Sequence, residues 1–346
     1  MSEPPAIELG PEDKPLVPKE ATGLPQASNA GWTGPTYYGR PQLKAAPFNN
    51  WIVGGYIALA GLSGASAILS ALADLTRGRG GQRSAEGVVR RGRYLALLAP
   101  TLGSALLIWD LHTPKRFYNM LRVAKRTSPM SIGTWLLMSF AGFSGIAAAA
   151  QLVADRVPGR RWPRRAARAG GIPAAAVGAG LSTYTAALLS ATSTPLWAAA
   201  PQALAVRFGS SSVASGAAAL SLLERSGRTG RALDKVALAA LAAELVAAGA
   251  ARRTYKRKGV TEALDSGWGR AETLGATALG TALPLGLYAL SLATERHRSP
   301  GLTRLASLAV LGGSFLLRVS IMGAGDVSAE RPEVSFRFSQ PDNLPG

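Results

Sequence analysis

The stretch NWIVGGYIALAGLSGASAILSALAD, residues 50–74, decides the class of fold because it holds no charged side chain before its last residue. An α-helix needs about 20 consecutive apolar residues to cross the hydrocarbon core of a bilayer. Glycine, alanine and serine are spread through the run, and such small residues let helices approach closely in lipid. The stretch therefore predicts a membrane-spanning helix packed inside a bundle.

The rest of the chain repeats this pattern. Only 17% of its 346 residues are charged, against about 25% in a typical soluble domain. The charges crowd into short clusters between long apolar runs, so we predict an all-α membrane protein, a bundle of eight transmembrane helices. The expected spans are 50–74, 94–112, 131–154, 172–191, 202–223, 233–251, 271–293 and 304–323. The fifth is the weakest, because serines dilute it between Ser210 and Ser215.

A basic segment joins the second and third expected spans. Pro114 breaks the second helix, and residues 117–123 place apolar side chains at helical spacing, with Arg122 among them and Lys and Arg on both sides of the stretch. This pattern predicts a short interfacial amphipathic helix between helices two and three. Ser128-Pro129 then indicates the N-terminal boundary of the third helix.

The two ends of the chain differ from the apolar middle. Residues 1–36 are polar and rich in proline, without a basic segment followed by an apolar one, so we expect a disordered polar tail and no cleavable signal peptide. Residues 37–326 are expected to form the transmembrane domain. Residues 327–346 are expected to form a polar C-terminal tail.

The net charge of +18 would suggest nucleic-acid binding in a soluble protein. Here the Arg clusters lie in short loops between apolar runs, where membrane topology places them, so we expect no nucleic-acid partner. The loops after spans one, three, five and seven, counted with the first turn of the span that follows each, carry 19 Lys and Arg residues, against 11 in the internal loops opposite. We therefore expect a multi-pass protein of the cytoplasmic (inner) membrane with both termini outside. The basic loops 113–130 and 252–270 depart from this rule, and a docked protein partner would account for them.

The residue inventory excludes several kinds of redox centre. The chain has no cysteine, which excludes thiolate-held iron–sulfur clusters, Cys-bound zinc and disulfides. Its two histidines, His112 and His297, are too few for a pair of bis-His haems. We expect no haem or metal in this chain.

Polar side chains inside spans are costly and are therefore candidates for function. Glu244 lies in the middle of the sixth expected span, as either a proton relay or a structural hydrogen-bonding group. Arg318, deep in the eighth, needs a carboxylate, a carbonyl or a ligand, and Asp110 or Asp326 are candidate partners. Arg207 lies near a span end, where its side chain can extend to the interface.

Five stretches together resemble one membrane-protein family. They are YYGRPQLKAAPFNNW (37–51), YIALAGLSGASAIL (56–69), DLHTPKRFYNMLRVAKRTSPMSIGTW (110–135), STYTAALLSATSTPLW (182–197) and RVSIMGAG (318–325). In this order the chain resembles the NrfD/PsrC family, the polysulfide reductase-type integral membrane subunits of respiratory oxidoreductases. It departs from the family pattern at His112-Thr113, where a Gly-Arg or similar pair is usual.

The resemblance implies a haem-free membrane anchor that is not catalytic alone and that binds a quinone or quinol, either menaquinone or ubiquinone. It implies a docked ferredoxin-like subunit with [4Fe–4S] clusters, and through it a catalytic subunit with molybdopterin or several haems. Carried over by motif position, the candidate quinone-binding residues are Asn50, Tyr56, Asp110, His112 and Tyr184. The chemistry of these residues supports part of this role. Quinone carbonyls need hydrogen-bond donors such as Tyr or Asn, and an Asp/His pair can exchange protons with the quinone.

Two other functions fit parts of the sequence. Secondary transporters use Gly- or Pro-broken helices near the midplane, and Pro284 and Gly286 interrupt the seventh span. No clear pair of broken helices occupies corresponding halves of the chain, however. The other alternative is a purely structural anchor, which docks a redox partner without quinone chemistry.

Overall fold

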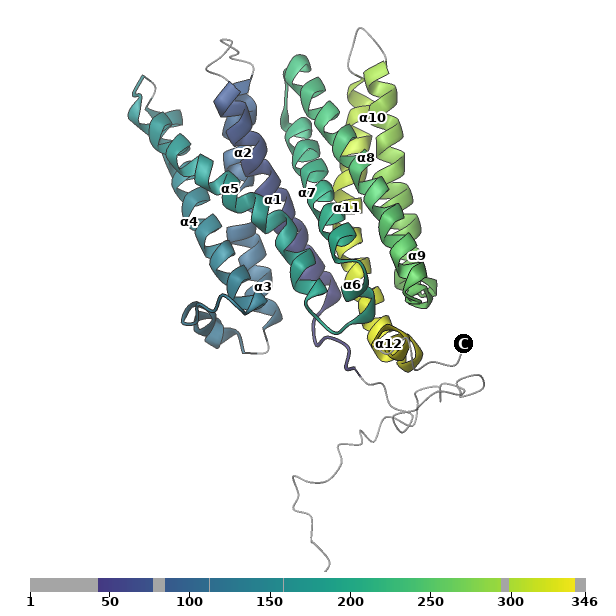
Figure 1. Cartoon of the computed structure of the whole chain (residues 1–346). Helices are drawn as coiled ribbons and strands as arrows, with labels where there is room; N and C mark the ends of the chain where they lie inside the picture. The colour runs from purple at the N-terminus through teal and green to yellow at the C-terminus, as the bar shows by residue number, and fades with distance from the viewer. Residues whose placement is uncertain (1–42, 77–84, 112, 158, 294–298, 340–346) are drawn as a thin grey trace, which may run out of the picture.

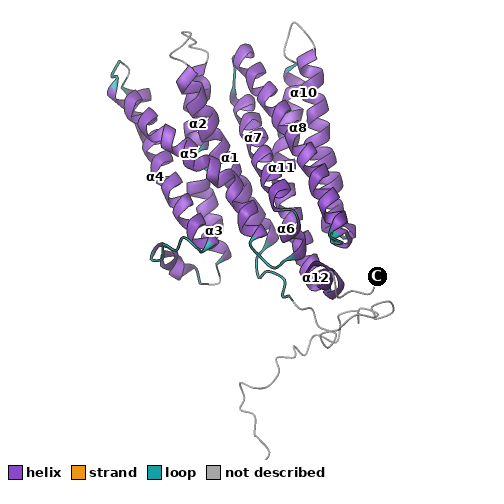
Figure 2. Ribbon diagram, in the orientation of Figure 1, coloured by secondary structure: helices purple, strands orange, loops and turns teal. Residues whose placement is uncertain are grey.

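The computed structural model of the chain describes residues 43–76, 85–111, 113–157, 159–293 and 299–339. These residues form helices joined by short loops, with no strand among them (Figure 2). Six helical stretches are long and apolar enough to cross a membrane, and each contains or overlaps one of the eight expected spans. They are Asn50–Thr76, Glu86–Asp110, Pro129–Arg156, Trp162–Ser190, Gly267–Ala293 and Pro300–Glu330. The expected disordered tail, residues 1–36, lies outside the described residues.

The fifth and sixth expected spans form long helices that fall short of this apolar threshold. They are α7 (Pro201–Leu223) and α8 (Gly227–Arg257). The serines of α7 and the charged ends of α8 lower their hydropathy. Both nevertheless run alongside the six apolar stretches in the bundle (Figure 1).

The long helices pack in two groups. The first comprises α1 (Asn50–Thr76), α2 (Glu86–Leu95) with α3 (Ser104–Asp110), α4 (Pro129–Arg156) and α5 (Trp162–Ser190). The second comprises α7, α8, the stretch from α9 (Gly267–Arg270) through η7 (Ala271–Ala282) to α10 (Leu283–Ala293), and α11 (Pro300–Glu330). In Figure 1 the first group lies on the left and the second on the right, and α1 joins them by contacting both α7 and α11.

Small residues permit the tightest crossing in the first group. A Cβ on Gly64 of α1 would collide with the backbone carbonyl of Gly178 in α5. The two backbones therefore meet directly, which is how membrane helices gain packing energy without a hydrophobic driving force. Gly64 belongs to the run that opened the sequence analysis.

The second span is not a continuous α-helix. A π-helical turn, η4 (Ala99–Gly103), separates α2 from α3. Pro100 lies in this turn, and proline removes a backbone donor and clashes with the preceding turn. The backbone N–H of Gly103 instead bonds to the carbonyl of Leu98 at 3.0 Å. The result is a local bulge facing α1, and such bulges often accompany functional sites.

The segment expected to form an amphipathic helix is a short 3₁₀-helix, η5 (Pro114–Leu121). It lies at the lower end of the bundle between α3 and α4 (Figure 1). Ser128 caps α4, its side chain accepting from the backbone N–H of Ser131 at 3.3 Å, as the sequence predicts. Part of the expected C-terminal tail is helical, since α11 continues to Glu330 and α12 (Pro332–Ser339) follows.

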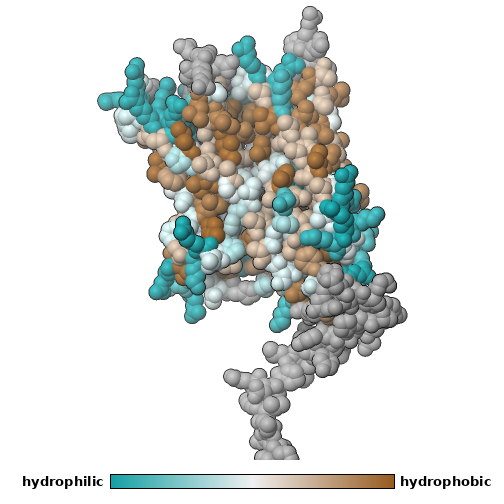
Figure 3. Space-filling model, in the orientation of Figure 1, coloured by the Kyte–Doolittle hydropathy of each residue, from teal (hydrophilic) through white to brown (hydrophobic). Residues whose placement is uncertain are grey.

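The surface has the polarity of a membrane protein. Figure 3 shows apolar side chains over the middle of the bundle and hydrophilic patches at its two ends. Large apolar residues are exposed on the outside of several helices, among them Leu152, Val246, Leu279 and Leu308. Together with the six apolar helices, this surface makes the chain a multi-pass membrane protein.

Candidate functional site

A cavity of about 350 Å³ lies among the helices of the first group near the lower end of the bundle. Its walls come from α1, η4, α3, α4 and α5, and the segment before α1, η5, α6 (Pro195–Ala199) and α11 close it. Most lining side chains are apolar, and the polar ones are few: Tyr56, Asp110, Thr134, Tyr184, Thr185 and Thr192. Small-molecule sites have this composition, with apolar walls and a few polar groups that fix orientation.

Tyr184 reaches the cavity from α5. Its hydroxyl donates a 2.5 Å hydrogen bond to the backbone carbonyl of Pro129, the first residue of α4. The ring packs over Gly133, one turn further along α4, where a Cβ would collide with it. Gly133 therefore creates the space that lets the phenol stand at the cavity wall.

Tyr56 and Asp110 face the same cavity from α1 and α3. Both side chains are half-buried. Asp110 ends α3, and one of its carboxylate oxygens accepts a 3.3 Å hydrogen bond from the backbone N–H of Asn49. Within the described part of the chain the Tyr56 hydroxyl has no hydrogen-bond partner. Among the described residues, the Tyr56 hydroxyl is therefore free to bind a ligand, and the Asp110 carboxylate already accepts one hydrogen bond.

The structure places the remaining candidates differently. Asn50 does not line the cavity; its side-chain amide donates a 2.8 Å hydrogen bond to Asp326 near the end of α11. Asp326 also accepts from the backbone N–H of Ala46 at 3.3 Å. The Asn50–Asp326 pair thus holds the segment whose next residues, Pro47 and Phe48, close the cavity. His112 lies outside the described residues.

Glu244 and Arg318 lie in the second helix group and not at the cavity. Glu244 is buried and accepts a 3.1 Å hydrogen bond from Thr281. Arg318 is fully buried and donates to the Ser314 carbonyl at 2.7 Å and to the Ser212 hydroxyl at 2.9 Å. Neither Asp110 nor Asp326 pairs with Arg318, because both carboxylates bind the segment before α1 instead. Hydroxyl and carbonyl oxygens bind the two terminal nitrogens of this guanidinium, and a carbonyl was one of the alternatives that the sequence left open. Its Nε has no hydrogen-bond partner among the described residues.

The expectation that Arg207 extends to the interface is wrong. Its side chain is only 3% exposed and forms an ion pair with Glu272 of η7 at 2.5 Å. The same guanidinium donates to Thr277 at 2.7 Å. A buried charge needs such a partner, and Glu272, at the edge of the seventh expected span, is the signal that sequence reasoning missed.

The surface beside the cavity mouth is basic and aromatic. Segment 113–126, which follows α3, exposes Lys115, Arg116, Arg122, Lys125 and Arg126. Trp109 is 77% exposed and Tyr118 is 53% exposed on the same side. Exposed aromatic and cationic side chains of this kind mark protein-binding surfaces.

Sequence reasoning also missed three residues that shape the site. Gly133 lies within a stretch quoted above, but nothing in the sequence indicates that it faces Tyr184. Trp197 lines the cavity, and its indole N–H donates a 2.7 Å hydrogen bond to the Ile321 carbonyl. Met120 of η5 covers the cavity from below. No group of three or more His, Cys, Asp or Glu side chains within the described ranges is placed to hold a metal ion.

Comparison with known proteins agrees with this architecture. A family model described as "Polysulphide reductase, NrfD" matches residues 42–329, which is most of the chain and nearly all of the described helices. No curated protein sequence matches the chain significantly. The chain belongs to the NrfD family of polysulphide reductase membrane subunits, which are the membrane subunits of respiratory oxidoreductase complexes.

Proposed function

We propose that this chain is the quinone-binding subunit of its complex and exchanges electrons between the quinone pool and a docked ferredoxin-like subunit with [4Fe–4S] clusters. One observation carries the proposal. Tyr56, Asp110 and Tyr184, which stand on three helices and in three of the quoted stretches, line a single apolar cavity. A chain without a redox centre of its own takes part in electron transfer only by holding a diffusible carrier.

The residues present fit a quinone, whose bound ring supplies a couple of two electrons and two protons. The apolar walls suit a ring with an isoprenoid tail. Tyr56 supplies a free hydroxyl that donates to one carbonyl oxygen, and Tyr184 supplies a second by turning from the Pro129 carbonyl. Asp110 lies at the end of α3, where its carboxylate gives and takes protons between the site and the solution. Asn50 acts as a positioning residue through Asp326.

The basic segment 113–126 and the residues before α1 form the proposed docking surface for the iron–sulfur partner. This surface lies directly over the cavity, because Pro47, Phe48 and Met120 belong to both. A partner held by these residues would therefore lie a short distance from a ring bound in the cavity. The catalytic subunit, with molybdopterin or several haems, attaches through that partner and does not contact the cavity.

We propose that α7 and α8 also cross the membrane, giving eight spans. Both are long enough, since 23 and 31 residues correspond to about 35 and 46 Å of helix. α7 buries four of its five serines and Arg207 inside the bundle, so these polar groups do not meet lipid. With both termini outside the cytoplasmic membrane, the cavity and the docking surface face that same outer side.

Glu244 and Arg318 are assigned a structural role in joining the helices of the second group. Glu244 connects α8 to η7 through Thr281, and Arg318 connects α11 to α7. We expect Glu244→Gln to keep this hydrogen bond and the quinone-linked turnover. Retained turnover with lost proton translocation would instead assign Glu244 to proton transfer.

The experiment measures quinone-linked turnover of the intact complex, purified in mild detergent, with Tyr184→Phe or Asp110→Asn in this chain. We expect turnover to fall about fivefold in Tyr184→Phe, which loses one hydrogen bond, and at least about 100-fold in Asp110→Asn, which loses a proton-transfer group. The iron content and the co-purifying subunits should stay unchanged. Tyr94→Phe is the matched control, because its hydroxyl bonds Asp155 and not the cavity. Unchanged turnover in both variants would favour a purely structural anchor.

A further inference from the structure

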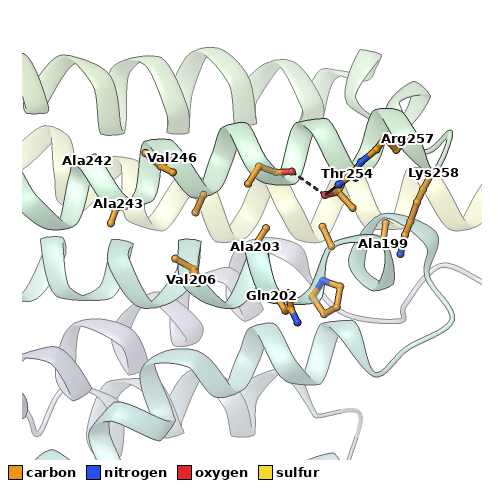
Figure 4. Close-up of a pocket in the computed structure, with 14 residues that line it drawn as sticks. Ala199, Gln202, Ala203, Val206, Ala242, Ala243, Val246, Thr254, Arg257 and Lys258 are labelled. Carbon is orange, nitrogen blue, oxygen red and sulfur yellow. Dashed lines mark hydrogen bonds between the residues drawn. The ribbon is translucent and has the colours of Figure 1, made fainter.

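A second hollow, separate from the first cavity, runs between α7 and α8. Its volume is about 830 Å³, and it begins beside α6 and follows α8 to its end (Figure 4). Half of the residues that line it are alanines: Ala199, Ala200, Ala203, Ala242, Ala243, Ala247 and Ala250. Because alanine side chains are short, the two helices leave an open groove along their contact.

The groove is open to the membrane along one side. Val206 on α7 and Val246 on α8 stand on its rim and are 54% and 75% exposed. No charged side chain lines this part of the groove. An apolar groove of this kind at membrane depth is solvated by hydrocarbon chains.

One end of the groove is cationic. Arg257 and Lys258 close it there, with the hydroxyl of Thr254 between them and the apolar walls. Figure 4 shows the Lys258 side chain reaching from the end of α8 toward α6. In the described part of the chain no carboxylate lies within 4 Å of either cation; Arg257 contacts Thr254, and Lys258 lies over the ring of Phe338. The end of the groove therefore carries two positive charges that no acid among the described residues neutralises.

The length of the groove matches one leaflet of a bilayer. Ala242 and Lys258 are sixteen positions apart on one helix, which corresponds to about 24 Å. Half of a bilayer, headgroups included, measures roughly 20–22 Å. The apolar part then lies at the depth of acyl chains, and the two cations lie at the depth of headgroups.

We propose that this groove binds one anionic phospholipid, its acyl chains along the alanines and its phosphate on Arg257 and Lys258. Basic pockets between membrane helices recognise anionic headgroups in this way. A quinone would leave both cations without a counter-ion, since it carries no charge. A membrane helix of another subunit would fill the apolar walls and would leave the same two charges unpaired. The lipid alone satisfies both parts of the groove.

The test reconstitutes the full chain in nanodiscs that contain equal amounts of phosphatidylglycerol and phosphatidylcholine. Native mass spectrometry then counts the phospholipids that stay bound after release. We expect wild-type protein to keep phosphatidylglycerol in preference to phosphatidylcholine. Arg257→Gln/Lys258→Gln should weaken phosphatidylglycerol binding by about 30-fold, the loss expected for two interfacial cations.

Matched controls separate this site from general charge and packing. Arg253→Gln/Lys256→Gln removes two exposed cations of the same helix that do not line the groove, and it should keep the lipid. Ala243→Trp fills the groove from an exposed position and should displace the lipid without a change of charge. Ala232→Trp places the same ring on an exposed position of α8 outside the groove and should have no effect.

Three results would overturn the proposal. One is wild-type protein that keeps no phospholipid or keeps both lipids equally. Another is an equal loss of lipid in the two double-glutamine variants. The third is a photo-crosslinker at Val246 that captures a helix of another subunit in native membranes, which would show that the groove is a subunit interface.

Discussion

Replacing Gly133 by alanine adds a methyl group at the point where α4 meets the ring of Tyr184. The new Cβ would overlap several ring atoms of the tyrosine, so the ring must move or the two helices must separate. Overpacking of this kind costs about 1–3 kcal/mol. The higher helix propensity of alanine relative to glycine stabilises the helix by about 0.5–1 kcal/mol. We therefore expect Gly133→Ala to lose up to roughly 2.5 kcal/mol of stability.

The same change should weaken quinone binding. The Tyr184 hydroxyl leaves its position beside Pro129, and one hydrogen bond contributes about 1 kcal/mol. The expected result is an affinity about fivefold lower for a short-chain naphthoquinone. Quenching of tryptophan fluorescence measures the affinity, since Trp197 lines the cavity. The thermal midpoint in detergent measures the stability.

Gly142→Ala provides the control on the same helix. No atom lies within 4 Å of a Cβ at that position, so the substitution should be neutral or slightly stabilising and should leave quinone affinity unchanged. Equal behaviour of Gly133→Ala and Gly142→Ala would refute the reasoning, because it would show that Tyr184 does not stand against Gly133.

Three further predictions follow from the contacts described. Tyr56→Phe should lower quinone affinity about fivefold by the fluorescence assay with an unchanged thermal midpoint, since its hydroxyl bonds nothing else among the described residues; a fall in midpoint with unchanged affinity would contradict this. Glu272→Ala should destabilise the protein by about 3–5 kcal/mol, because it leaves Arg207 buried without its ion-pair partner. Glu262→Ala, at an exposed ion pair, should cost at most about 1 kcal/mol. Thermal unfolding compares the two variants, and equal costs would contradict the burial of the Arg207–Glu272 pair. Asn50→Ala should speed hydrogen exchange at residues 46–49 without changing exchange in α5, and unchanged exchange there would show that the Asp326 bond does not hold the segment.

Much of the fold is predictable from the sequence, because membrane helices are constrained chiefly by length and charge. The Pro129 start follows from the Ser128-Pro129 boundary, and the first span matches 50–74 within two residues. The last helix begins at Pro300, four residues before the expected 304. The fifth and sixth spans are harder. A helix whose polar residues face its neighbours has a low mean hydropathy although it is buried, and α7 is such a helix.

The candidate site is predictable only in part. Tyr56, Asp110 and Tyr184 emerge from quoted stretches, but their meeting in one cavity depends on how each helix is rotated about its own axis. Packing sets that rotation, as at Gly133 against Tyr184, and a sequence does not reveal it. Arg207 shows the same limit. Because Arg207 lies near the end of its span, the sequence suggests an exposed side chain. The rotation of α7 turns that side chain toward Glu272 and buries it.

The proposed function depends most on whether the quinone binds in the cavity of the first helix group. A quinone analogue with a photoreactive diazirine beside its ring, irradiated with the intact complex in native membranes, would label the residues around the ring, and peptide mass spectrometry would locate them. We predict labels on residues 47–57, 107–111, 130–137 and 181–189, competed away by excess unlabelled quinone and reduced by Tyr184→Phe. Labels confined to the groove between α7 and α8, or to a different subunit, would contradict the assignment of the cavity.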